Sequence, residues 1–236
     1  DIRLGLKYLK LRREIVAPIL TVGIPSIIMM AIGSVMNFCM NQIFMSFKDT
    51  YGQTPATVFG IYFRLQSFFL MPLFGINNAS ISIVAYNYGA RQPKRIANTL
   101  KCGLAAAMVI MLLGLTVFQL FPDVLMGIFG SSEDAASADL VKFGIGALRI
   151  VSIHFPIAAV GIALGASFQA LGNGTYSAIT SLCRQLVVLV PAAYLLSLTG
   201  SVDAVWWAFP LAEIVSATLT VIFFVRIYKQ KVKPML

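Results

Sequence analysis

Residues 15–47 read IVAPILTVGIPSIIMMAIGSVMNFCMNQIFMSF and contain no charged side chain. A helix needs about 20 mainly apolar residues to cross the hydrocarbon core of a bilayer, so this stretch alone is long enough to span a membrane. In the whole 236-residue chain, 58% of residues are hydrophobic and 11% are charged, whereas about 25% are charged in a soluble domain. The sequence therefore predicts an integral membrane protein and excludes a disordered chain, a secreted disulfide scaffold and almost any cytosolic enzyme.

Five further apolar stretches follow the first one. We expect six membrane spans in all, at about 15–47, 56–86, 102–122, 138–170, 176–198 and 204–225. The apolar runs are continuous rather than alternating, which favours helices over strands. The sequence therefore predicts an all-α bundle of six transmembrane helices over residues 15–228, with a basic segment at 1–14 and a basic tail at 229–236.

The basic residues indicate how the bundle is oriented. Thirteen of the 18 Lys and Arg residues lie at the termini and after the second span: Arg3, Lys7, Lys10, Arg12, Arg13, Arg91, Lys94, Arg95, Lys101, Arg226, Lys229, Lys231 and Lys233. Because cytoplasmic loops carry the excess of Lys and Arg, we expect a multi-pass protein of the cytoplasmic (inner) membrane with both termini of this chain in the cytoplasm. The net charge of +9 then reflects topology and contact with membrane lipids, and no nucleic-acid partner is expected.

Two spans carry polar and flexible side chains at helical spacing. In the first span these include Met30, Gly33, Asn37 and Asn41, and in the second they include Arg64, Phe68, Met71 and Asn78. Residues three or four apart share one face of a helix, so each set forms a stripe. The stripes are consistent with a cavity wall or with close helix packing, and Arg64 could instead extend to the membrane surface. The candidate cavity residues are Met30, Met36, Asn37, Asn41, Arg64, Phe68, Met71 and Asn78.

Glu213 is the only carboxylate in the interior of the predicted spans, because Asp139 lies at the edge of the fourth. At a rise of 1.5 Å per residue it lies about 14 Å from the outer boundary, close to the depths of Arg64 at about 12 Å and Arg149 at about 16 Å. We therefore expect Glu213 to pair with one of these arginines or to carry protons. Arg184 lies near the cytoplasmic end of the fifth span, in the other half of the membrane, so we expect it not to pair with Glu213.

His154 lies in the middle of the fourth span and is the only histidine in the chain. It is a candidate for proton relay, and the simpler alternative is a hydrogen bond to a neighbouring helix. Pro156 follows it closely, so we expect a local break in the helix there. No metal site is expected, because the chain offers one histidine and three scattered cysteines.

Two stretches resemble a known family of transporters. They read MPLFGINNASISIVAYNYGARQPKRI at 71–96 and FPIAAVGIALGASFQALGNGTYSA at 155–178. Both resemble the multidrug and toxic compound extrusion (MATE) transporters, in the bacterial subgroup with MepA-like and DNA-damage-inducible pumps. The Asn-Tyr-Gly-Ala turn at 87–90 is the more specific piece, and the likeness covers essentially the whole chain.

This resemblance implies a fold, a function and a partner. Family members have two six-helix lobes around a central cavity, and this chain is similar to the second lobe, with residues 1–14 as the linker between lobes. The implied activity is antiport of organic cations or amphipathic drugs against protons or sodium ions, without enzymatic chemistry or a cofactor. The implied partner is the missing first lobe or a second copy of this chain.

The chain departs from the sodium-coupled branch of the family. That branch has acidic residues in the first and fourth spans of this lobe, where this sequence has Asn37, Asn41 and Gln42, then Arg149 and His154. Glu213 is left as the candidate for the coupling ion in this lobe. An alternative function is a lipid-linked oligosaccharide flippase of the same superfamily, in which Arg64, Arg149 and Arg184 would hold a pyrophosphate. A six-helix channel or assembly module is a further alternative.

Overall fold

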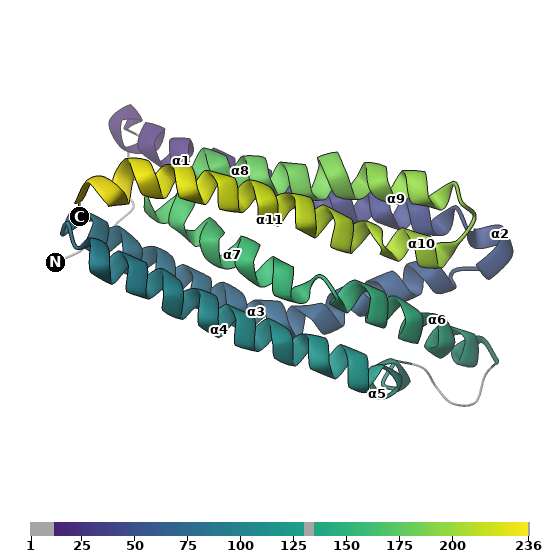
Figure 1. Cartoon of the computed structure of the whole chain (residues 1–236). Helices are drawn as coiled ribbons and strands as arrows, with labels where there is room; N and C mark the ends of the chain where they lie inside the picture. Colours follow the sequence, from purple (N-terminus) through teal and green to yellow (C-terminus); the bar gives the residue numbers. More distant parts are fainter. Residues whose placement is uncertain (1–11, 130–134, 236) are drawn as a thin grey trace, which may run out of the picture.

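The computed structural model describes residues 12–129 and 135–235, so residues 1–11 of the predicted linker lie outside it. In these two ranges the chain forms helices and no strand, which confirms the predicted all-α class (Figure 1). The elements are α1 (Arg13–Met45), α2 (Lys48–Tyr51), α3 (Thr54–Gly89), α4 (Pro93–Leu120), α5 (Pro122–Gly127), α6 (Ala135–Ser152), α7 (Phe155–Ala170), α8 (Gly174–Leu182), the π-helix η2 (Cys183–Leu189), α9 (Val190–Ser197), α10 (Val202–Trp206), α11 (Ala208–Ile227), the π-helix η3 (Tyr228–Val232) and the 3₁₀-helix η4 (Lys233–Met235).

The long helices correspond to the predicted membrane spans. Among the residues whose side chains are described, four stretches are long and apolar enough to cross a membrane: Thr54–Gly89, Pro93–Leu120, Gly174–Ser197 and Val202–Met235. A fifth is the pair α6 and α7, which is bent by 47° between Ser152 and Phe155. Helix α1 has 33 residues and covers most of the first predicted span. The last stretch continues into the predicted tail, because η3 and η4 follow α11 directly.

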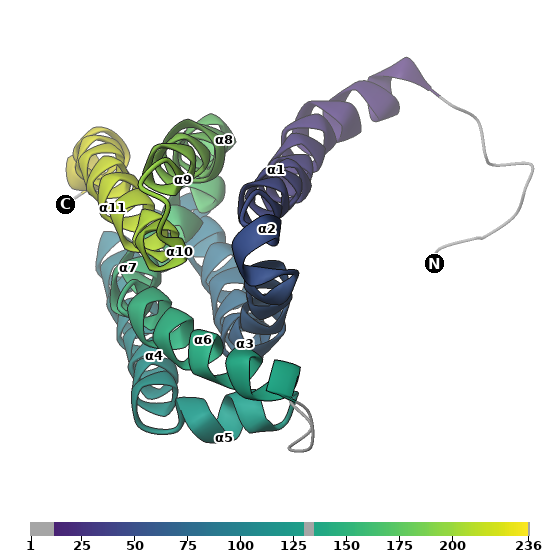
Figure 2. The same cartoon turned by 90° about the vertical axis from the view of Figure 1, so that its right-hand side faces the viewer.

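Helix α7 is the centre of the bundle. It packs against α3, α4, α8 and α11, while α1 packs against α3, α8 and α9. Figure 2 looks along the bundle and shows α1 on one side of it. The short helices α2 and α10 lie at one end, which we call the α10 end (Figure 1). The opposite end holds the connections 90–92 and 171–173 and the last turn of α11, and we call it the basic end.

Two hydrophobic clusters fill the bundle: a large one extends from the α10 end into the middle, and a smaller one lies at the basic end. At the α10 end Phe44 packs against Trp206, with ring centroids 4.4 Å apart, and Phe59 lies beside both. The cluster at the basic end comprises Val84, Ile96, Leu100, Phe168, Leu171, Ile227 and Val232. Most of the buried polar side chains lie along the interior of the bundle, beside residues of both clusters. They are Gln66, His154, Ser177, Thr180, Glu213, Ser216 and Thr220, and we call them the polar layer.

Two of the spans are irregular near this layer, and a third contains a proline. The α6–α7 pair breaks around His154, as the nearby proline predicted. The fifth span changes to π-helical geometry over Cys183–Leu189, and such segments occur often at functional sites. Helix α3 contains Pro72 but stays helical from Thr54 to Gly89. His154 therefore lies at the helix break and Arg184 lies within the π-helical segment.

Candidate functional site

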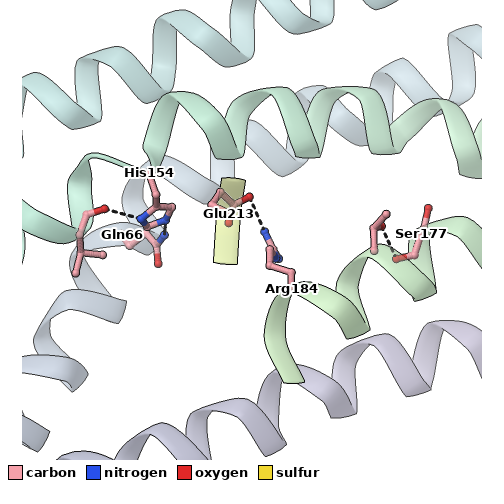
Figure 3. Close-up of polar contacts among 7 residues, drawn as sticks. Gln66, His154, Ser177, Arg184 and Glu213 are labelled. Atoms are coloured by element: carbon pink, nitrogen blue, oxygen red, sulfur yellow. Dashed lines mark hydrogen bonds and ion pairs between the residues drawn. The ribbon is translucent and has the colours of Figure 1, made fainter. Parts of the chain in front are cut away.

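An ion pair between Arg184 and Glu213 lies in the polar layer (Figure 3). Nη1 of Arg184 is 3.5 Å from Oε1 of Glu213, and the Glu213 side chain is 7% exposed against 32% for Arg184. Arg184 is the second residue of the π-helical segment and Glu213 lies in the second turn of α11. Gly161 of α7 lies beside the carboxylate, since a Cβ there would be 3.6 Å from Oε1, in ordinary van der Waals contact. The carboxylate is thus enclosed by three different spans.

The predicted partners of Glu213 were wrong. Arg64 and Arg149 are both exposed, and the partner is Arg184, which we expected not to pair. Arg184 lies eight residues after the start of the fifth predicted span, about 12 Å from the cytoplasmic boundary. Glu213 was placed about 14 Å from the outer boundary. In a hydrocarbon core about 30 Å thick the two Cα atoms then differ by only a few ångströms in depth. An arginine side chain is long enough to cover that difference.

His154 and Gln66 form a second polar contact on the other side of Glu213 (Figure 3). His154 is buried, and its Nδ1 donates a hydrogen bond to the carbonyl oxygen of Val151. A carbonyl oxygen only accepts, so Nδ1 carries a proton. Nε2 of His154 lies 3.4 Å from Nε2 of Gln66, so the neutral ring accepts a hydrogen bond from the Gln66 amide. Both contacts fix the orientation of the ring at the helix break.

Two cavities lie beside the ion pair and share Phe74, Ile162, Arg184 and Glu213 as lining residues. The first, of about 140 Å³, extends to Tyr62, Gln66, His154 and Phe209. The second, of about 130 Å³, extends to Gln169, Ser177, Thr180 and Thr220. Because both cavities reach the same two charged groups, the ion pair stands where they meet. Glu213 is the only carboxylate among the described residues that line them.

The second cavity has polar atoms without a protein partner. Oγ of Ser177 and Oδ1 of Asn77 are buried and form no hydrogen bond to any described residue, and both residues line this cavity. Buried polar groups in proteins are nearly always hydrogen-bonded, either to protein or to water. A cavity with such atoms and a carboxylate is therefore suited to water molecules or a small cation.

The candidate residues of α3 form one exposed face. Arg64, Phe68, Met71 and Asn78 follow one another at helical spacing and are all exposed, with Phe68 at 74% and Met71 at 72%. Of these four, none is a lining residue of the two cavities beside the ion pair. The predicted stripe therefore exists and points out of the lobe, not toward the ion pair.

The candidate residues of α1 separate into different environments. Met36 is buried and lines the first cavity. Asn37 is half-buried and donates from its side-chain amide to the carbonyl oxygen of Gly33 at 3.0 Å, while Asn41 is exposed. The side chain of Met30 lies outside the described part of the chain. The predicted stripe on α1 thus contributes one residue, Met36, to the central cavities.

Several lining residues were not among the sequence candidates. Gln66, Tyr62, Ser177, Thr180 and Thr220 line the cavities but carry no charge. One signal was available in the sequence, because Ser216 and Thr220 lie three and seven residues after Glu213 and so share its face of α11. No comparable signal marks Gln66, whose role depends on the distant His154.

Long apolar helices that bury charged and polar groups at mid-length define the class of this protein: a multi-pass membrane protein. The model of the MatE family matches residues 25–195, and the chain belongs to this family. MatE proteins are transporters and not enzymes, which confirms the expected class.

The relatives agree with this assignment. The chain is 25% identical over 216 residues to the multidrug export protein MepA of Staphylococcus saprophyticus, covering 92% of this chain and 46% of that protein. It is also 25% identical over 215 residues to MepA of Staphylococcus haemolyticus, with 91% and 45% covered. The chain therefore spans about half the length of the curated relatives it matches.

Solved structures show the same fold. One is an outward-facing multidrug resistance MATE transporter, with a TM-score of 0.82, 24% identity, and coverage of 99% of this chain and 50% of that one. Another is a transporter of the same superfamily from Pyrococcus furiosus, with a TM-score of 0.83, 23% identity, and the same coverage. The chain has the fold of one half of these transporters.

Proposed function

We propose that this chain is the second lobe of a secondary multidrug exporter, which moves organic cations or amphipathic drugs out of the cell against protons or sodium ions. The observation that carries the proposal is the buried Arg184–Glu213 pair between two cavities, found in a chain of the MatE family. Ionisable groups inside a membrane are costly and usually mark an ion or substrate pathway. The two relatives named above are multidrug export proteins.

In this proposal Glu213 binds the coupling ion. Its carboxylate faces Arg184 and borders the second cavity, where Ser177 and Asn77 offer unpaired oxygen atoms. Oxygen donors suit a proton carrier or a hard cation. Binding of a proton or a sodium ion at Glu213 would weaken its attraction to Arg184. The coupling step is thus a change of partner for Arg184. His154 and Gln66 line the first cavity, on the side of Glu213 away from Ser177.

The exposed face of α3 is proposed to line the drug cavity, opposite a first lobe or a second copy of this chain. Phe68 and Met71 are too exposed to belong to the core of this lobe. Aromatic and methionine side chains adapt to ligands of varied shape, and Asn78 on the same face adds a polar group. Such a surface suits a transporter with many substrates.

Replacing Phe68 with Ala should reduce export of a fluorescent organic cation. An aromatic contact of about 1 kcal/mol corresponds to about a fivefold loss of apparent affinity, and a triple variant with Met71→Ala and Asn78→Ala should lose more. Dye export from intact cells that express each variant of the complete transporter measures the effect. Phe121→Ala is the matched control, because Phe121 is an exposed aromatic residue outside this face. Unchanged export of every dye by the triple variant would contradict the assignment.

We propose that the basic end of the bundle faces the cytoplasm, following the distribution of Lys and Arg. Single cysteines at Thr50 and Gln92, which are both exposed and lie at opposite ends, should therefore react differently. In a background without native cysteines, Thr50→Cys should react with an impermeant maleimide in intact cells. Gln92→Cys should react only after the membrane is permeabilised. The reverse pattern would show that the orientation is inverted.

The structure does not favour the flippase alternative. That function needs arginines gathered around a pyrophosphate, but Arg64, Arg149 and Arg184 lie on three different elements, α3, α6 and η2. Arg184 is already paired with a carboxylate. Of the three, only Arg184 lines the two cavities beside the ion pair.

A further inference from the structure

A groove on the side of the bundle lies between α4, α7 and α11, away from the ion pair. Its volume is about 250 Å³, and its lining residues are Ala97, Leu100, Lys101, Leu104, Leu164, Phe224 and Tyr228. Lys101 is the one charged residue in this lining. The hydrophobic cluster of the basic end forms its floor, since Leu100 belongs to that cluster and Phe224 and Tyr228 pack against it. The groove is thus apolar over most of its length and positively charged at one point.

Basic side chains continue from the groove toward the end of the bundle. Lys94, Ala97, Lys101 and Leu104 are spaced by three, four and three residues, so they share one face of α4. Lys94 and Arg95 also line a hollow that the last helix, η4, borders with Met235. Along the helix axis Lys94 and Lys101 are about 10 Å apart. An elongated molecule in the groove would therefore meet two lysines on the same face.

These basic residues are available for a ligand. Lys94, Arg95 and Lys101 are exposed, and none of them forms an ion pair with a carboxylate among the described residues. Lys231 is not available in the same way, because its Nζ donates a hydrogen bond to the carbonyl oxygen of Leu171 at 2.6 Å. That hydrogen bond ties η3 to the connection 171–173 and so holds one wall of the groove in place.

We propose that this groove binds an anionic phospholipid of the surrounding membrane. An acyl chain would lie along Leu104, Leu164 and Phe224, while Lys94 and Lys101 would hold the phosphate. Charge complementarity favours this occupant: the groove is apolar like a lipid chain, and its lysines lie at the end where the basic residues of the chain collect. Basic pockets between transmembrane helices are known to bind anionic head groups. The site is independent of the drug cavity and of the ion pair.

Lipid binding to the purified protein tests the proposal, with phosphatidylglycerol as the probe and phosphatidylcholine in parallel. Native mass spectrometry counts the bound lipids at each concentration. Each lysine near an anionic lipid contributes about fivefold to the affinity, so Lys94→Gln with Lys101→Gln should weaken phosphatidylglycerol binding about 25-fold. Lys48→Gln is the matched control, since Lys48 is an exposed lysine at the α10 end and should leave the binding unchanged.

A second variant tests the apolar part of the site. Leu104→Trp places a large ring in the groove and should also weaken phosphatidylglycerol binding, with both lysines intact. Glycerol phosphate, which has the anionic group without the chains, should not displace the lipid. The proposal is overturned if the double lysine variant binds phosphatidylglycerol as tightly as the unmodified protein. Equal binding of phosphatidylcholine, or displacement of the lipid by glycerol phosphate, would overturn it as well.

Discussion

Glu213→Gln is expected to reduce drug export to the level of cells that lack the transporter, because the amide cannot bind and release the coupling ion. The same change leaves Arg184 without its partner in the bundle. Removing one member of a buried ion pair lowers the free energy of unfolding by roughly 3–5 kcal/mol. Because Arg184 is partly exposed to solvent, we expect a loss of about 3 kcal/mol or less. The variant should therefore also denature at a lower temperature in detergent.

A double variant separates these two effects. Arg184→Gln together with Glu213→Gln removes both charges, so neither variant residue leaves an unpaired charge in the bundle. We expect the double variant to regain much of the lost stability and to remain inactive in ion-driven export. With the single variant Arg184→Gln the cycle is complete, and its interaction energy measures the ion pair, while dye export measures the coupling. Full export by a stable double variant would show that the pair is structural. Asp123→Asn, an exposed carboxylate at the α10 end, is the control.

Gly114→Val should strongly destabilise the lobe. Gly114 of α4 is buried, and a Cβ at this position would lie 3.1 Å from ring atoms of both Phe69 and Phe155. Phe118 packs against both rings, with centroids 5.9 and 5.1 Å away, so the rings have little room to move. Overpacking of this kind costs about 1–3 kcal/mol. At about 2–4 °C for each kcal/mol, the melting temperature should fall by several degrees.

The effect of Gly114→Val should extend to transport. Phe155 is the first residue of α7 and directly follows His154, so displacement of its ring disturbs the helix break. Thermal unfolding in detergent and dye export in cells provide the two measurements. Gly60→Val is the matched control, since Gly60 is also in a helix but a Cβ there meets nothing within 4 Å. Similar losses in both variants would show that the β-branched side chain, not the clash, causes the instability.

The fold was largely predictable because the lipid bilayer requires every membrane-spanning helix to be long and apolar. Each span needs about 20 apolar residues, and uncharged runs such as 15–47 or 102–122 are visible without knowledge of tertiary contacts. The break near His154 was also predictable, since Pro156 cannot continue a regular helix. The π-helical segment at Cys183–Leu189 was not, because no residue type in it specifies that geometry.

The site was less predictable, because it depends on which helices become neighbours. Counting residues along straight spans gave similar depths to Glu213, Arg64 and Arg149, but depth does not say which faces meet. Glu213 faces η2 because α11 packs against that segment, which brings Arg184 within reach. The exposed stripe of α3 is different: periodicity alone places Phe68 and Met71 on one face, so this part could be read from the sequence.

The arrangement of the two hydrophobic clusters has a mechanical meaning. The large cluster ties the helices together from the α10 end into the middle of the bundle, and the smaller cluster does so at the basic end. The polar layer beside them holds cavities and irregular helix segments, at the break near His154 and at Cys183–Leu189. Helices bend most easily where regular backbone hydrogen bonding is interrupted. We therefore expect the lobe to flex at these two segments, and the only ion pair among the described residues joins Arg184 of the π-helical segment to Glu213.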